Sequence, residues 1–170
     1  MSRQKPQIFL SYSAFDEEHD RGRLSALCSR LKEEVRLQTG EEVSIWRDRE
    51  EIKGGDNWRE TIEQQLRDSD ILIAFITPSY LNSRFCRQEI TQFLDKEKDQ
   101  KRKGLIVPII YLGSEEHLTD NDLGREIVSR RGFDWRALRF EPFTSSRLKR
   151  EIEKTATAIG KALETVTATG

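Results

Sequence analysis

The chain has 170 residues, and its 35% of hydrophobic side chains excludes an intrinsically disordered protein, although another 35% of the residues are charged. A chain of this length suits one domain around a single core. Its 29 basic and 30 acidic residues nearly cancel, which argues against nucleic acid or an anionic membrane as the main partner.

The first third of the chain predicts two strands, one helix and a loop. Residues 7–11 are a short apolar run that ends at a small polar residue, which is typical of a buried parallel strand. Apolar side chains at helical spacing predict a helix over residues 21–38, with a glycine stop signal behind it. Residues 43–46 predict a second strand, and a glycine-broken loop runs from Arg47 to Trp58.

The middle of the chain predicts the central strand of a sheet, with a helix before and after it. Trp58, Ile62 and Leu66 step by four residues, as they would along one side of a short amphipathic helix. Residues 70–76 are apolar on both faces and give the strongest strand signal of the chain. Another helix is expected over residues 79–100.

The last third predicts two further strands and a closing helix. Residues 105–111 are expected to form the fourth strand, and the polar stretch 113–131 is expected to be the least regular part of the chain. A short fifth strand is predicted within residues 132–135, and a closing helix over residues 148–166.

Strands that alternate with helices indicate an α/β fold whose mostly parallel sheet is covered on both faces. Right-handed crossovers favour a flavodoxin-like, doubly wound sheet with strand order 2-1-3-4-5. We expect one domain over residues 1–165 and, at 166–170, a linker or the cut end of a longer protein, which would lead to another domain. Ligands of such sheets bind outside the carboxyl ends of the strands, so the candidate site comprises the segments 11–16, 47–58 and 77–89.

The cellular setting is expected to be the cytoplasm. The two cysteines lie in helix-like segments, at neither disulfide-framework nor CxxC spacing. Nothing near Met1 resembles a signal peptide, and no apolar run approaches the ~20 residues that span a bilayer. We therefore expect reduced thiols and no direct membrane insertion.

Several kinds of site are excluded by the motifs that the sequence lacks. Neither GxGxxG nor GxxxxGK[ST] follows the first strand, which argues against dehydrogenases and kinases. A receiver domain would need acidic residues where Ser11 and Thr77 stand. His19 and His117 are isolated on polar segments, and no GxSxG motif is present, so neither a metal site nor a Ser-His-Asp triad is expected.

Glu89 is a carboxylate at an unusual place. At about 100° per residue, it lies roughly 80° from the centre of the apolar face of its helix, which predicts a rim residue close to both core and cleft. Partial burial there restricts its rotamers and suits a carboxylate that stabilises a developing cation. A solvated or salt-bridged glutamate is the alternative. The apolar face itself contains Cys86, which is expected to be a packed thiol, with Ile90, Phe93 and Leu94.

Three motifs lie at the three segments of the candidate site. The first is Ile8-Phe9-Leu10-Ser11-Tyr12-Ser13, followed by Asp16. The second is Trp46-x-Asp48-x-x-x-Ile52-x-x-Gly55-x-x-Trp58. The third is Ser79-Tyr80-Leu81-x-Ser83-x-Phe85-Cys86-x-x-Glu89. In this order and on these elements, the motifs resemble the TIR (Toll/interleukin-1 receptor) domain family, over nearly the whole chain.

The resemblance implies an enzyme. In the enzymatic branch of the family, the glutamate matched by Glu89 is needed to cleave the bond between nicotinamide and ribose in NAD+. This chain is therefore expected to be an NAD+ nucleosidase of the bacterial type, which releases nicotinamide and ADP-ribose or a cyclic ADP-ribose. Glu89 is the expected catalytic residue, NAD+ is the substrate, and neither a metal nor a cofactor is expected. Substrate binding is expected at Ser11, Tyr12, Ser13, Phe15, Asp48, Trp58, Ser83 and Phe85.

One departure from the family pattern affects the phosphates of the substrate. Some NAD-cleaving relatives have basic residues after the first strand, where this chain has Ser13 and Ala14. Phosphate contacts are therefore expected from Arg47, Arg49 or Lys53 in the loop after the second strand.

The resemblance also implies protein partners. Many TIR domains contact other TIR domains through the loop that runs here from Arg47 to Trp58, so self-association is expected to activate the enzyme, in bacterial defence or virulence. The main alternative is a non-enzymatic TIR–TIR interaction module that acts as a signalling adaptor. A third interpretation is an enzyme like the nucleoside deoxyribosyltransferases, which share the sheet and use a glutamate nucleophile on the equivalent helix.

Overall fold

The structure is a computed structural model that describes residues 5–47, 58–130 and 132–168. Its elements follow one another in the order β1 (Gln7–Ser11), α1 (Ala14–His19), α2 (Arg23–Thr39), β2 (Ser44–Arg47), α3 (Trp58–Asp68), β3 (Ile71–Ile76), α4 (Pro78–Asn82), α5 (Arg84–Asp99), β4 (Ile106–Ile110), α6 (Glu115–Leu118), α7 (Asp122–Ser129), β5 (Phe133–Asp134), η1 (Arg136–Leu138) and α8 (Ser146–Ala168).

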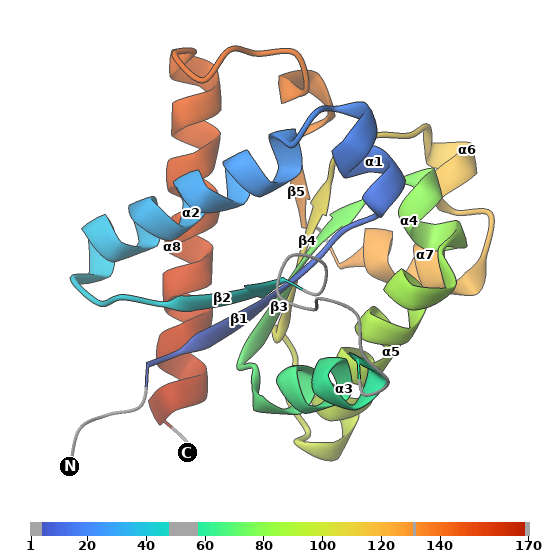
Figure 1. Cartoon of the computed structure of the whole chain (residues 1–170), viewed down its shortest axis with the longest axis vertical. Helices are drawn as coiled ribbons and strands as arrows, with labels where there is room; N and C mark the ends of the chain where they lie inside the picture. Colours follow the sequence, from blue (N-terminus) through green and yellow to red (C-terminus); the bar gives the residue numbers. More distant parts are fainter. Residues whose placement is uncertain (1–4, 48–57, 131, 169–170) are drawn as a thin grey trace.

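The strands form one parallel sheet with the order β2-β1-β3-β4-β5, which confirms the predicted order (Figure 1). β1 pairs with β2 on one side and with β3 on the other, so that Ile8 lies opposite both Ile45 and Ile71. Winding therefore reverses between β1 and β3, and the carboxyl ends of these two strands border the place where a ligand of such a sheet binds.

Two apolar clusters cover the two faces of the sheet. One lies under α2 and α8, and the other under α3, α4, α5 and α7 (Figure 1). Successive side chains of a strand point to opposite faces, so Ile8 and Leu10 of β1 join the α2 and α8 cluster while Phe9 joins the other. Phe9 packs there at a tilt on Trp46, with ring centroids 5.1 Å apart, and Trp46 is buried.

The helix predicted over residues 79–100 is in fact two helices, α4 and α5, with a break at Ser83. The backbone of Ser83 is extended (φ −79°, ψ 122°), and its Oγ accepts a hydrogen bond from the N–H of Cys86 at 3.3 Å. Thr77 caps α4 in the same way, because its Oγ1 accepts from the N–H of Tyr80 at 3.0 Å. Two hydroxyl N-caps six residues apart thus start two helices where periodicity alone predicts one.

Two further parts of the secondary structure differ from the expectation. The segment 113–131 is not irregular where it is described, because α6 and α7 begin there behind the N-caps Ser114 and Asn121. The helix expected over about residues 21–38 is α2, and a separate helix that was not expected, α1, precedes it. Gly22 lies between the two helices with φ +81°, a left-handed conformation that glycine adopts without strain.

A cluster of partly buried polar groups connects the end of α1 to the segment after β5. Arg139 donates two hydrogen bonds to the carboxylate of Asp20, from Nε at 3.0 Å and from Nη2 at 2.9 Å. The hydroxyl of Tyr111 donates to the same carboxylate. The Arg139 guanidinium beside Asp20 holds the pKa of that carboxyl well below its usual range, although partial burial acts in the opposite direction.

This cluster predicts an acid-sensitive contribution to stability. The folded pKa of Asp20 is lowered, so its contribution is complete above the unfolded pKa of about 3.9 and is lost as the pH falls through the folded value. Arg139→Ala should lower the free energy of unfolding by about 1–2 kcal/mol at pH 7. Urea titrations should then show the gap to wild type narrowing below about pH 4. A gap that stays constant down to pH 3 would contradict this role.

Within the described residues, no helix has both the length and the apolar composition that crossing a membrane requires.

Candidate active site

Three buried side chains meet at the carboxyl edge of the sheet. Ser11 ends β1, Tyr80 lies in α4, and Glu89 lies in the second turn of α5. The Ser11 hydroxyl donates to Oε1 of Glu89 at 3.2 Å, and it is 2.8 Å from the hydroxyl oxygen of Tyr80. The exposed fractions are 1% for Ser11, 0% for Tyr80 and 3% for Glu89.

Local structure explains why these side chains converge. The alternation of β1 turns Ser11 to the same face of the sheet as Phe9, which is the face under α5. The Thr77 cap fixes the start of α4 and with it Tyr80, and the Ser83 cap fixes the start of α5 and with it Glu89. Glu89 is more deeply buried than the predicted rim residue. The prediction used the helical projection of α5 alone, whereas Ser11 of β1 and Tyr80 of α4 lie next to Glu89 in the fold.

Glu89 also contributes to the wall of a groove of about 580 Å³ between α3 and α5. The groove is lined by Trp58, Arg59, Ile62, Glu63, Leu66, Asn82, Arg84, Phe85, Arg87, Gln88, Glu89, Thr91 and Gln92. Trp58 and Phe85 meet edge to face there, with ring centroids 5.5 Å apart, and Phe85 remains 45% exposed. The groove therefore offers an aromatic surface to a flat ring and ends near a buried carboxylate.

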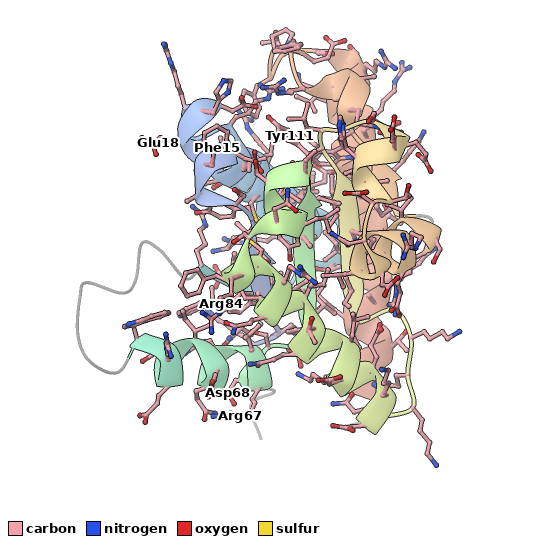
Figure 2. All side chains as sticks on the ribbon, turned by 90° about the vertical axis from the view of Figure 1, so that its right-hand side faces the viewer. Phe15, Glu18, Arg67, Asp68, Arg84 and Tyr111 are labelled. Carbon is pink, nitrogen blue, oxygen red and sulfur yellow. The ribbon has the colours of Figure 1, made fainter. Side chains whose placement is uncertain are left out.

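The positive charges of the groove lie near the first turns of α5. Arg84 and Arg87 are both exposed, and Figure 2 shows Arg84 at the start of α5, above α3. Arg59 of α3 places its guanidinium 5.2 Å from the centre of the Trp58 ring. Guanidinium groups beside a helix N-terminus favour an anionic ligand such as a phosphate.

Two further contacts hold the surroundings of the site in place. The hydroxyl of Thr77 donates to the carboxylate of Asp16 at 2.5 Å, which joins α1 to the cap of α4. Burial raises the pKa of the Asp16 carboxyl, while the Thr77 hydrogen bond acts in the opposite direction. The thiol of Cys86 is buried, as expected, and donates to the carbonyl of Tyr12 at 3.4 Å.

The structure brings some of the predicted site residues together and places others elsewhere. The groove is lined by Trp58, Phe85 and Glu89, and Ser11 donates a hydrogen bond to Glu89. Four of the predicted substrate contacts do not line the groove. Tyr12 and Ser13 are buried, and Ser83 caps α5. Phe15 is 65% exposed on α1, with its ring 6.1 Å from that of His19. Asp48, Arg49 and Lys53 lie outside the described residues.

Tyr80 and Arg84 belong to the site although neither was singled out as a functional residue. Tyr80 stands inside the third motif, but only the folded chain shows that its hydroxyl reaches Ser11. Arg84 is the first residue of α5, and the serine before it gives a capping signal that could have marked this helix N-terminus. Among the described residues, no three His, Cys, Asp or Glu side chains gather as a metal site would require.

Comparisons with known proteins identify the fold and the family. A family model described as TIR domain matches residues 8–150. No curated protein sequence matches the chain significantly. Three solved structures, each 16% identical to the chain, resemble it, and at this identity the likeness concerns the fold alone.

Two of these structures are TIR domains and one is described as an oxidoreductase. The TIR domains of the activated Roq1 resistosome, which recognises the pathogen effector XopQ, match 90% of this chain and 84% of theirs, with a TM-score of 0.50. The TIR domain of the Toll-related receptor TRR-2 from Hydra magnipapillata matches 85% and 96%, with a TM-score of 0.49. An oxidoreductase from Corynebacterium diphtheriae matches 96% and 99%, with a TM-score of 0.53.

Proposed function

This chain belongs to the TIR domain family, and we propose that it is an NAD+ glycohydrolase with Glu89 as its catalytic residue. The observation that carries the proposal is the position of Glu89. The residue is 3% exposed, its carboxylate accepts a hydrogen bond from the hydroxyl of Ser11, and it lines a groove with an aromatic wall and a basic rim. A carboxylate shielded from bulk water acts on a developing positive charge more strongly than one in solution.

The chemistry of NAD+ cleavage suits a single carboxylate. The bond between C1′ of the ribose and the nicotinamide nitrogen breaks, and its electron pair returns to the pyridinium ring, which leaves as neutral nicotinamide. The ribose passes through an oxocarbenium-like state that Glu89 stabilises electrostatically. A water molecule then adds to C1′ and releases a proton to give ADP-ribose, whereas attack by a nitrogen of the adenine ring gives the cyclic product.

The groove supports a placement for the rest of the substrate. Trp58 and Phe85 offer their aromatic surfaces to one of the two flat rings of NAD+. Arg84 and Arg87 are in reach of the diphosphate when the ribose lies beside Glu89, because all three side chains line the same groove. In this proposal the arginines of α5 take the role for which the sequence suggested Arg47, Arg49 or Lys53.

Arg84→Gln tests this placement. We expect KM for NAD+ to rise about fivefold and kcat to stay within about twofold, because a phosphate far from the reacting bond is held equally in the ground and transition states. Initial rates of nicotinamide release at low and high salt measure the effect, which should shrink as salt screens the exposed guanidinium. Arg125→Gln on α7, away from the groove, is the matched control. A fall in kcat at unchanged KM would contradict the placement.

Self-association is proposed as the activating step, in the cytoplasm and in bacterial defence or virulence. The loop expected to mediate it runs from Arg47 to Trp58, and its residues 48–57 lie outside the described residues. The Roq1 TIR domains were determined in an activated resistosome, and this setting of a structural neighbour supports an assembled active form.

Product analysis after incubation with NAD+ tests the function directly. The protein is compared in dilute solution and at high density on affinity beads, and nicotinamide, ADP-ribose and cyclic ADP-ribose are separated by chromatography. Release of nicotinamide, greater at high density, supports the proposal. Absence of release in both states favours the non-enzymatic interaction module. Activity on deoxynucleosides without activity on NAD+ favours the deoxyribosyltransferase-like enzyme.

A further inference from the structure

We infer that Ser11 and Tyr80 form a hydroxyl pair that positions the carboxylate of Glu89 for cleavage, an inference that rests on the proposed function. Neither residue is a catalytic residue in this scheme. Both act through Glu89, and Ser11 takes a positioning role in place of the substrate contact expected from the sequence.

The contacts form a chain from α4 through β1 to α5. The Tyr80 and Ser11 hydroxyl oxygens are 2.8 Å apart, and the Ser11 oxygen is 3.2 Å from Oε1 of Glu89. All three side chains are at least 97% buried, so bulk water does not compete for these hydrogen bonds. The tyrosine and the serine are separated by 69 residues in sequence, and the serine and the glutamate by 78. This series of hydrogen bonds therefore forms only in the folded domain.

The number of available protons determines which group donates in each of these two hydrogen bonds. A serine hydroxyl has one proton, and Ser11 donates it to Glu89 when the carboxylate is ionised, because an ionised carboxylate only accepts. The oxygen of Ser11 is then an acceptor for the hydroxyl proton of Tyr80. In the arrangement Tyr80 to Ser11 to Glu89 the carboxylate only accepts, which is the role of the ionised form that stabilises an oxocarbenium-like ribose.

The packing around the pair explains why Glu89 needs it. A glutamate side chain has three rotatable bonds, and Glu89 also lines the groove between α3 and α5. Fixing Oε1 on Ser11 holds the plane of the carboxylate against β1, and Tyr80 in turn fixes the rotation of the Ser11 hydroxyl. Misplacement of a catalytic group by about 1 Å lowers a rate about 100-fold. Loss of these hydrogen bonds should therefore lower the rate of the chemical step rather than the affinity for the substrate.

Three variants test the pair by steady-state kinetics of nicotinamide release. Ser11→Ala removes both hydrogen bonds and should lower kcat about 10- to 100-fold, with KM within about twofold. Tyr80→Phe keeps the ring, removes the outer donor and should lower kcat about fivefold. The double variant Ser11→Ala/Tyr80→Phe should be no slower than Ser11→Ala, because Tyr80 acts only through Ser11. Equal, independent losses for the two substitutions would overturn the inference.

Matched controls separate positioning from loss of packing. Ser69→Ala removes another buried serine hydroxyl, one that donates to the carbonyl of Gln65 at the far end of α3. Tyr111→Phe removes another tyrosine hydroxyl, the one that donates to Asp20. Both controls lower the unfolding temperature if their hydrogen bonds stabilise the fold, but neither should change kcat. A loss of kcat in the controls as large as in Ser11→Ala would overturn the inference.

A measurement without substrate separates this inference from the proposed function. The carboxyl carbon of Glu89 is observed by NMR in protein labelled with ¹³C-glutamate and is assigned by its absence in Glu89→Gln. Its chemical shift should move in Ser11→Ala and Tyr80→Phe and stay in Ser69→Ala. If NAD+ is cleaved but neither the shift nor kcat responds to Ser11→Ala, the inference fails and the function stands. If the shift responds but NAD+ is never cleaved, the function fails, and with it the catalytic purpose of the pair.

Discussion

Glu89→Gln should lower the rate of nicotinamide release by a factor on the order of 10²–10³ while the protein stays folded. The substitution keeps the size of the side chain and leaves an amide oxygen that still accepts the hydrogen bond from Ser11. What it removes is the negative charge beside the ribose. The loss should therefore appear in kcat, since the charge acts on the transition state rather than on the bound substrate.

The measurement combines kinetics with a test of folding. Rates are followed by chromatography of nicotinamide, and circular dichroism with thermal unfolding checks that the fold is kept. Glu60→Gln makes the same chemical change at an exposed position of α3 outside the groove and should retain full activity. If Glu89→Gln is as active as wild type, Glu89 is not the catalytic residue. If it loses activity together with its folded signal, Glu89 is a structural residue.

Arg130→Ala should lower the free energy of unfolding by about 3 kcal/mol, the largest stability change that we expect from one surface-reaching side chain. Nη1 of Arg130 lies 2.6 Å from Oε1 of Glu97, whose side chain is 4% exposed. The other oxygen of Glu97 accepts the N–H of Leu105 at 3.0 Å, so this carboxylate joins α5, the start of β4 and the end of α7. Without Arg130 the charge of Glu97 stays buried and loses the guanidinium that compensates it.

Chemical denaturation of two further variants distinguishes this cause from a general loss of contacts. Arg125→Ala removes an arginine that pairs with the exposed Asp122 on the same helix, and it should change stability by less than about 1 kcal/mol. Glu97→Gln combined with Arg130→Met removes both charges, and it should recover most of the stability lost in Arg130→Ala. Equal losses for Arg125→Ala and Arg130→Ala would show that the burial of Glu97 does not matter.

The sheet could be predicted from the sequence because each strand carries its own signal. Each strand appears as a short apolar run, and right-handed crossovers restrict the order of parallel strands to few possibilities. The short helices α6 and α7 were missed because they contain four and eight residues, too few for apolar periodicity to show. Their N-caps Ser114 and Asn121 were the available signals.

The candidate site was predictable only in part. The position of Glu89 on α5 follows from helical spacing, and its catalytic role was inferred from the resemblance alone. Its depth of burial could not be predicted, because it depends on Ser11 and Tyr80, which lie on other elements. Apolar periodicity also does not reveal the break between α4 and α5 at Ser83. Residues before and after this break therefore do not share the single helical projection that the sequence predicted. The roles of Asp48 and of the loop around it stay predictions.

Side chains of β1 alternate between the two faces of the sheet, so only its odd-numbered residues face the candidate site. Phe9 and Ser11 face α5, whereas Leu10 and its even-numbered neighbours face α2 and α8. Inserting one residue within this strand would exchange the two sets, so that an apolar side chain would lie against Glu89 and the serine would enter the opposite core. The strand can thus accept many substitutions in evolution but hardly any change in length, and homologues that keep the activity should differ in β1 by replacement and not by insertion or deletion.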